Sequence, residues 1–370
     1  MVTNYAALGI KPIINAAGNL TNLGGSVMPP EVVVAWVEAS KNFVDIRELQ
    51  NKVGERISQL FVVDAALVTT GAAGAILLGT VAAINRSHSQ QIPDAEQSSE
   101  FQNEIILQRS HHSEYDSQLL TPNTKLIEVE TLSDLEAAIT PRTALLFFMN
   151  YLESAGQIGR ADWIKLARRH NVPTLLDASA DVPPLERISE YTRLGFDMIA
   201  VSGGKAMRGP NDTGLLLGRR EFIEVARQNT SPNEPTIGRV LKVGKEDTMA
   251  LLAAVERFVT LDHKAEWAEM ERRIAVIEHA LDGIPSVVCQ RIVPPISNHQ
   301  PHLIIDWDAG QIRLSVEQVT QTLKANDPPI HIGRVAGTGD RGILISVLAL
   351  QAGEIDVVAD CLRAIFTGRH

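Results

Sequence analysis

Short apolar runs of strand length alternate with helix-like stretches between about residues 60 and 220. The runs are "AALVTT" (65–70), "NEIILQR" (103–109), "KLIEVE" (125–130), "TALLFFM" (143–149), "VPTLLD" (172–177) and "DMIAVS" (197–202). Stretches with helical periodicity separate most of them, such as "GAAGAILLGTVAAI" (71–84), "ADWIKLARRH" (161–170) and "LERISEYTRLG" (185–195). Apolar strands joined by helical crossovers are typical of a parallel sheet that is covered on both faces. The pattern predicts an α/β domain with a mainly parallel sheet, to which "TGLLLGR" (213–219) adds an antiparallel strand.

The pattern changes in the last third of the chain. A long helical region at about 246–282 is broken near Asp262, and a strand follows at "HLIID" (302–306). A helix near 315–325, strands near 330–334 and 342–347, and a terminal helix come next, which indicates a smaller α+β domain. We therefore expect three parts. They are an N-terminal segment that packs across both domains (1–50), a large α/β domain (51–255) and a small C-terminal α+β domain (256–370). The polar, aperiodic stretch 86–102 is expected to be a surface loop.

Composition narrows the class of protein. Hydrophobic residues make up 45% and charged residues 21% of the 370, and the formal net charge is −10, which argues against nucleic acid or anionic membranes as partners. The two cysteines, Cys289 and Cys361, form no metal or redox motif and suit a reducing cytoplasm. No export signal is visible, and no run approaches the ~20 apolar residues that span a bilayer. We expect a cytoplasmic globular protein.

Three chemical groups fall at the carboxyl ends of the predicted strands, where ligands gather in open α/β sheets. Asp177 ends one strand, Lys205 follows another after a glycine pair, and "TTGAAG" (69–74) joins a strand to a helix whose N-terminus can receive a phosphate. Pyridoxal 5'-phosphate (PLP) requires these parts: a Schiff-base lysine, an acid for the pyridine nitrogen and a phosphate site. Ser202 adds a hydroxyl near the phosphate. The 28-residue spacing from Asp177 to Lys205 fits one strand-to-strand crossover.

Each piece taken alone has an ordinary structural explanation, as a turn residue, a helix cap or close helix–strand packing. "SGGK" (202–205) also fits the S-x-x-K pattern of penicillin-recognising enzymes, but their companion motifs are missing. "GTGDRG" (337–342) fits G-x-G-x-x-G, yet a strand follows it, so we expect a hairpin turn. His111 and His112 lack a second cluster with metal spacing, and one of the pair is expected to face inward.

Several segments in order resemble a known family. They are "TNLGGSVMPPEVV" (21–33), "FVDIRELQ" (43–50), "TTGAAGA" (69–75), "SHHSEYD" (110–116), "LLDASADVPP" (175–184), "SGGKAMRGP" (202–210) and "IGRVLKVGKED" (237–247). Together they are similar to the selenocysteine synthase-like branch of fold type I PLP-dependent enzymes, and most of all to the D-glucosaminate-6-phosphate ammonia-lyase group. The resemblance spans nearly the whole chain and implies the aspartate aminotransferase-like fold.

By position, the resemblance implies that Lys205 is the Schiff-base lysine, Asp177 the partner of the pyridine nitrogen and His111 the ring that stacks on the cofactor. It assigns the phosphate contacts to Gly71, Ala72, Ala73 and Ser202. It assigns the substrate contacts to Arg208, Arg239, Lys242, His112 and Ser179. Arg239 and Lys242 are equally consistent with surface ion pairs. His112 and Ser113 stand where the lyase group has Arg and Asn, and Ser179 and Asp181 stand where relatives are mostly apolar or Glu.

The resemblance implies α,β-elimination from a small hydroxylated amino acid or amino sugar acid, with Lys205 as base. Racemisation or epimerisation, with His112, Tyr115 or Ser179 as a second acid, and transamination remain alternatives. A binding protein that keeps the fold without turnover is an alternative of another class. The family builds its sites between subunits, so we expect at least a homodimer. Compared with bacterial selenocysteine synthase, we expect the chain to lack the extra N-terminal tRNA-binding region.

Overall fold

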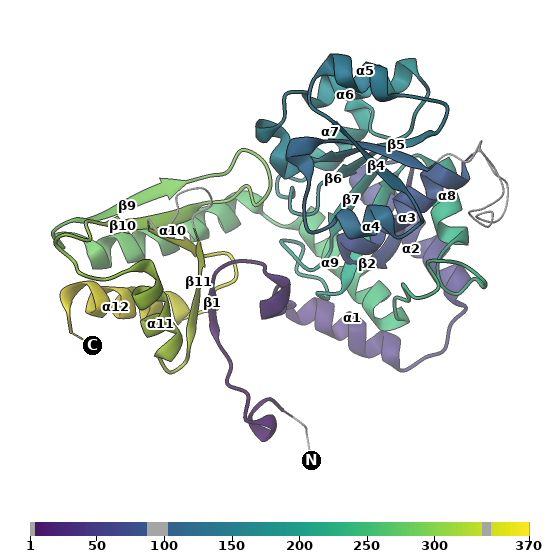
Figure 1. The fold of residues 1–370 in the computed structure, drawn as a ribbon. Coiled ribbons are helices and arrows are strands. Elements are labelled where there is room, and N and C mark those ends of the chain that lie inside the picture. The colour runs from purple at the N-terminus through teal and green to yellow at the C-terminus, as the bar shows by residue number, and fades with distance from the viewer. Residues whose placement is uncertain (1–3, 87–102, 335–341, 370) are drawn as a thin grey trace. The chain divides into compact units, whose positions relative to one another are not determined.

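The computed structural model describes residues 4–86, 103–334 and 342–369 (Figure 1). The chain forms two compact units: a large unit of residues 28–260 with 296–298, and a small unit of residues 1–27, 261–295 and 299–370. Compactness alone does not show that a unit folds independently, so the domain boundaries expected from the sequence stay a prediction. The predicted loop at 86–102 and turn at 337–342 fall almost wholly outside the described residues.

The large unit is built on a seven-stranded sheet in the order β2-β8-β7-β6-β5-β3-β4. Its strands are β2 (Ala65–Thr70), β3 (Glu104–Gln108), β4 (Lys125–Val129), β5 (Thr143–Met149), β6 (Thr174–Asp177), β7 (Met198–Ser202) and β8 (Thr213–Gly218). The neighbours from β4 to β7 are parallel, while β8 runs antiparallel to both β7 and β2. The predicted mainly parallel sheet with one antiparallel addition is confirmed.

Helices cover both faces of this sheet. The helices of the large unit are α1 (Pro30–Ser40), α2 (Ile46–Phe61), α3 (Gly71–Asn85), α4 (Asp116–Leu120), α5 (Leu132–Ala138), α6 (Arg160–Arg169), α7 (Arg187–Leu194), α8 (Arg220–Gln228) and α9 (Lys245–Thr260). One apolar core joins the sheet to α2, α6, α7 and α9, and a second joins it to α3, α4 and α8. Because both faces are buried, the strands are almost continuously apolar, which is why they were visible in the sequence.

The small unit has its own five-stranded sheet, in the order β1-β11-β12-β10-β9, and its own apolar core. Its strands are β1 (Ile14–Ala16), β9 (Val287–Ile292), β10 (His302–Trp307), β11 (Ile330–Arg334) and β12 (Ile343–Ser346), and its helices are α10 (His263–Leu281), α11 (Val316–Ala325) and α12 (Glu354–Thr367). The sequence analysis missed β1 and β9. The first has three residues, and the second alternates partly buried with exposed positions, so neither forms a continuous apolar run.

The predicted break in the long helical region is confirmed and has a local cause. The helix α9 ends at Thr260, and the Asp262 carboxylate accepts hydrogen bonds from the N–H groups of Lys264 and Ala265. An aspartate in this position satisfies N–H groups that have no partner within the helix, and so starts α10.

Candidate functional site

The lysine that ends the "SGGK" motif lies in the loop after β7, beside the carboxyl end of β6. Its Nζ donates a hydrogen bond to the Ser179 hydroxyl at 3.2 Å. The Ser179 amide donates in turn to the Asp177 carboxylate at 2.8 Å. The predicted amine and carboxylate are therefore joined through one residue, because β6 and β7 are parallel neighbours that end at the same edge.

Burial sets the electrostatics of this trio. Burial lowers the pKa of the Lys205 ammonium, while the charges of Asp177 and Asp181 partly oppose that effect. Burial also raises the pKa of the Asp177 carboxyl, and hydrogen bonds from Ser179 and the Lys205 charge act against the rise. A desolvated lysine loses its proton more readily, which suits an amine used for chemistry.

The N-terminus of α3 forms a cradle of small residues directly after β2. Gly71 has a positive φ of 64°, which favours glycine, and Ala72 and Ala73 follow it in the first turn. The Thr70 side chain makes no capping bond there, and its Oγ1 is buried without a hydrogen-bond partner. An orphaned hydroxyl beside the N–H groups of a helix start is a suitable seat for a phosphate.

Strand β8 brings Ser202 to this cradle. Ser202 pairs with Gly214 across the β7–β8 ladder. A Cβ added at Gly214 would lie 2.3 Å from the carbonyl carbon of Gly71, so only glycine allows the backbones to approach this closely. The structure thus brings together the predicted phosphate contacts of the helix start and of β7.

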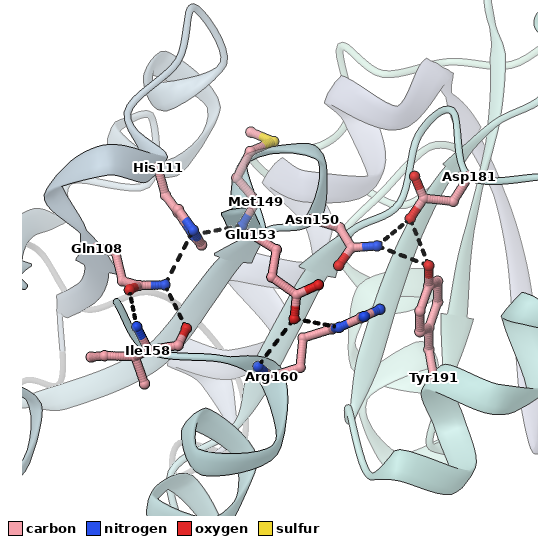
Figure 2. A network of polar contacts seen from close by, with 9 residues as sticks. All are labelled: Gln108, His111, Met149, Asn150, Glu153, Ile158, Arg160, Asp181 and Tyr191. Carbon is pink, nitrogen blue, oxygen red and sulfur yellow. Dashed lines mark hydrogen bonds and ion pairs between the residues drawn. The ribbon is translucent and has the colours of Figure 1, made fainter. Parts of the chain in front are cut away.

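His111 is fully buried at the carboxyl end of β3 (Figure 2). The Gln108 side-chain oxygen accepts a hydrogen bond from the Ile158 N–H at 2.8 Å, and its Nε2 donates to the Ile158 carbonyl at 3.0 Å. The same Nε2 lies 3.1 Å from the His111 Nε2. The Met149 N–H faces the other ring nitrogen at 3.3 Å. Burial lowers the pKa of His111 to about 4, opposed by a hydrogen bond with the Leu152 backbone. The ring is held neutral; its stacking on a cofactor stays a prediction.

A second buried carboxylate, Asp181, lies four residues beyond Asp177 (Figure 2). Its Oδ2 accepts hydrogen bonds from Asn150 Nδ2 at 2.5 Å and the Tyr191 hydroxyl at 2.9 Å. Its Oδ1 accepts one from the Ser297 hydroxyl at 3.1 Å.

The remaining candidate residues lie in more open surroundings. His112 is the outward member of the histidine pair, as expected, and the hydrogen bonds that its ring donates to the carboxylates of Asp116 and Glu128 raise its pKa. Arg239 forms an ion pair with Glu234 at 2.7 Å, and Lys242 is exposed. Among the described residues, no hydrogen bond joins Arg239 or Lys242 to the Lys205 trio.

Arg208 lies three residues beyond Lys205, in the same loop. It is partly buried and has a positive φ of 60°. Its N–H donates to the Lys205 carbonyl at 2.9 Å, which closes the loop that carries the lysine. Such a φ is uncommon outside glycine and often occurs near functional sites.

Sequence reasoning gave no role to several polar residues at this sheet edge. They are Gln108, Asn150, Tyr151, Tyr191 and Ser297. Gln108 and Asn150 were detectable in principle, because a buried amide at or just after the end of an apolar strand needs polar partners. Ser297 carried no signal, since its partner is more than a hundred residues away.

The residues present fit PLP. The orphaned Thr70 hydroxyl and the Gly71–Ala73 cradle would hold the phosphate, Lys205 the aldehyde carbon and Asp177 the ring nitrogen. Within the described ranges, no group of three His, Cys, Asp or Glu side chains could hold a metal ion. In the same ranges, no helix is both long and apolar enough to cross a membrane.

Comparison with known proteins agrees with this geometry. The model of the family Aminotransferase class-V matches residues 98–236. D-glucosaminate-6-phosphate ammonia lyase from Salmonella typhimurium (strain 14028s / SGSC 2262) is 28% identical over 338 residues, covering 88% of each chain. L-seryl-tRNA(Sec) selenium transferase from Aquifex aeolicus (strain VF5) is 24% identical over 362 residues, covering 87% of this chain and 77% of that protein.

Solved structures define the fold. A structure of D-glucosaminate-6-phosphate ammonia-lyase superimposes with a TM-score of 0.81 and 25% identity, over 100% of both chains. A serine palmitoyltransferase from S. paucimobilis with bound PLP shares the fold at a TM-score of 0.61 and 13% identity, over 97% of this chain and 88% of that one. Fold and site together define a PLP-dependent enzyme of fold type I. Within that class, the resemblance to D-glucosaminate-6-phosphate ammonia-lyase and the selenocysteine synthases is confirmed.

Proposed function

We propose that the protein is an ammonia-lyase that removes the α-proton and β-hydroxyl of a small hydroxylated amino acid or amino sugar acid. Loss of water leaves an enamine acid, and hydrolysis of its imine tautomer by water gives a 2-oxo acid and ammonia. The observation that carries this proposal is a partly buried amine, Lys205, joined through Ser179 to a buried carboxylate on the sheet edge that also holds the α3 cradle. Similarity to D-glucosaminate-6-phosphate ammonia-lyase over 88% of the chain supports the reaction type.

When bound, PLP withdraws electrons from the substrate's Cα and so makes the Cα proton acidic. Lys205 Nζ accepts that proton, since burial favours its neutral form. The Ser179 hydroxyl orients the amine by accepting its hydrogen bond. The leaving hydroxyl departs as water after taking up a proton, and we assign this proton to the protonated Lys205.

Several residues are proposed to bind the substrate's anionic groups. Arg208 is the best placed, because its loop is closed directly on Lys205. Arg239 and Lys242 would have to leave an ion pair or solvent to take part. His112 is held between two carboxylates that keep it cationic to higher pH than usual. Substrate-bound structures would separate these candidates.

We propose a homodimer or larger assembly of this chain, with a small amino acid-like substrate and without nucleic acid or membrane partners. The net charge of −10 supports the proposal that nucleic acid and membranes are not partners. We place the protein in the cytoplasm, where two free cysteines such as Cys289 and Cys361 are stable.

The proposal is tested first by the visible spectrum of the purified protein with added PLP. We expect an absorption band that borohydride abolishes, with the reduced adduct on the Lys205 peptide. A panel of hydroxylated amino acids and amino sugar acids is then assayed for 2-oxo acid, ammonia, chirality change and amino transfer. Release of 2-oxo acid with equal ammonia supports elimination, whereas chirality change or amino transfer alone would replace it.

Lys205→Ala is expected to lower kcat at least a thousandfold, because it removes both the attachment point and the base. Lys165→Ala, at an exposed position on α6, is the matched control and should behave like the wild type. Full turnover by the Lys205→Ala protein would overturn the assignment.

A further inference from the structure

The carboxyl group of Asp181 is held in place by neutral groups. The residue is fully buried, and its carboxylate accepts hydrogen bonds from Asn150 and Tyr191 (Figure 2). It also accepts one from the Ser297 hydroxyl. None of these donors carries a charge, so they fix the carboxylate without neutralising it. A charge that is buried in this way costs free energy unless a positive group lies nearby.

The charged groups around Asp181 come from four elements. Lys205 lies in the loop after β7, and its pKa responds to the Asp181 charge. Asp177, at the end of β6, repels Asp181. From α7, Arg187 donates to the Asp181 carbonyl at 3.2 Å, and from α6, Arg160 lies over the Tyr191 ring, 5.6 Å from its centre. Of these cations, the Lys205 amine is the one that gains and loses a proton in the proposed reaction.

The backbone around Asp181 is fixed along its length. The Asn298 N–H donates to the Ala180 carbonyl at 2.6 Å, and the Ser202 N–H donates to the Ser179 carbonyl at 3.2 Å. Ser297 and Asn298 both have positive φ angles, 47° and 51°, in the three-residue segment 296–298 that belongs to the large unit. This segment, distant in sequence, holds the loop that presents Ser179 to Lys205.

We propose that Asp181 is a positioning residue of the catalytic site: it anchors loop 177–181 so that Ser179 meets the Lys205 amine, and it is the counter-charge for a cationic nitrogen at Lys205. With PLP bound, Asp177 would face the ring nitrogen, and Asp181 is then the carboxylate left to balance the nitrogen at Lys205. The inference rests on the proposed role of Lys205.

The experiment compares Asp181→Asn, which keeps the shape of the side chain and removes its charge, with Asp162→Asn at an exposed position on α6. In the protein without PLP, Lys205 is labelled with acetic anhydride across a pH series, and its peptide is quantified by mass spectrometry. In the PLP-loaded protein, the pH midpoint of the visible absorption is measured. Neither readout depends on turnover.

We expect Asp181→Asn to lower both midpoints by about one pH unit, since removing a nearby negative charge disfavours the cation. At a fixed pH below the midpoint, that corresponds to about tenfold more neutral amine. Asp162→Asn should leave both midpoints unchanged. Unchanged midpoints in a folded Asp181→Asn protein would overturn the inference.

Two further results keep the inference separable from the proposed function and from misfolding. If the wild type takes up no PLP, the proposed function fails, while the labelling series still decides the role of Asp181. If Asp181→Asn does not fold, Asp181→Ser also removes the charge, keeps a hydroxyl that can hydrogen-bond to the same neighbours, and should lower the labelling midpoint in the same direction. An Asp181→Ser midpoint equal to that of the wild type then overturns the inference.

Discussion

At the scale of single residues, the protein holds the charge states of its site by burial and by neutral hydrogen-bonding partners. His111 shows this most simply. The Gln108 amide N–H points at Nε2 of the ring, so this nitrogen accepts, and a protonated ring would place N–H against N–H there. The Ile158 backbone hydrogen-bonds to both the oxygen and the nitrogen of the Gln108 amide, so this amide cannot flip and present its oxygen to the ring. The ring therefore stays neutral at physiological pH.

His111 should make stability depend on pH between about 6.5 and 4. Its pKa is about 4 in the folded chain and near 6.5 in an unfolded one, so the unfolded state binds the extra proton in this window. The free energy of unfolding therefore falls as the pH falls through it, by roughly 1.4 kcal/mol per unit from this group. Urea unfolding of the wild type and His111→Gln at several pH values measures the difference in slope.

The exposed His170→Gln serves as the control, because that ring lies at the end of α6 in solvent. His170→Gln should retain the wild-type slope. An identical slope in His111→Gln and the wild type would show that His111 is not held neutral.

At the scale of elements, the site depends on three strand ends and on the reversed direction of β8. The parallel strands β6 and β7 bring Asp177 and Lys205 to one edge. The antiparallel β8 then returns and lays Gly214 against the backbone of Gly71 and Ala72. This close contact is what sets the α3 N-terminus beside Ser202.

Gly214→Ala should therefore damage the phosphate seat. The added Cβ would lie 2.3 Å from the Gly71 carbonyl carbon and 2.7 Å from the Ala72 nitrogen, so the start of α3 must move. Overpacking of this kind costs about 1–3 kcal/mol of stability. We expect PLP to bind at least about tenfold more weakly, as measured by absorbance titration, which corresponds to about 1.4 kcal/mol.

Gly159→Ala is the matched control, because a Cβ at that position meets nothing within 4 Å. Its PLP affinity should equal that of the wild type. A Gly214→Ala protein with unchanged affinity would mean that the α3 N-terminus does not hold the cofactor.

At the scale of the whole molecule, each of the two compact units has its own sheet and core, and all the proposed catalytic residues lie in the large unit. Helix α1 in that unit leaves much apolar surface open. Val33, Val34 and Val37 are 41%, 59% and 42% exposed, while Val32 alone is buried against α9. Apolar surface of this kind is available for burial against another chain.

We expect the protein to have at least twice the mass of one chain in solution. Sedimentation equilibrium over a range of protein concentrations, with and without PLP, measures this mass. A single species with the mass of one chain at every concentration would contradict the homodimer proposal.

The sequence by itself determined the main course of the large unit and the order of its chemistry. Continuous apolar strands predicted the parallel sheet, because burial on both faces leaves an unambiguous pattern. Asp177 and Lys205 could be placed on one edge, since parallel neighbours end at the same side of a sheet. Strands β1 and β9 were missed because one is very short and the other is half exposed, so their identity depends on pairing rather than on pattern.

Only the tertiary structure decided how these groups are held. Ser179 meets Lys205, and Ser297 meets Asp181, through contacts between residues far apart in the chain. The two hydrogen bonds between the Gln108 side chain and the Ile158 backbone likewise join β3 to a segment beyond β5. Hydrogen-bond partners and burial depend on distances that a local pattern does not contain, and these two quantities shift the pKa values of Lys205, Asp177 and His111.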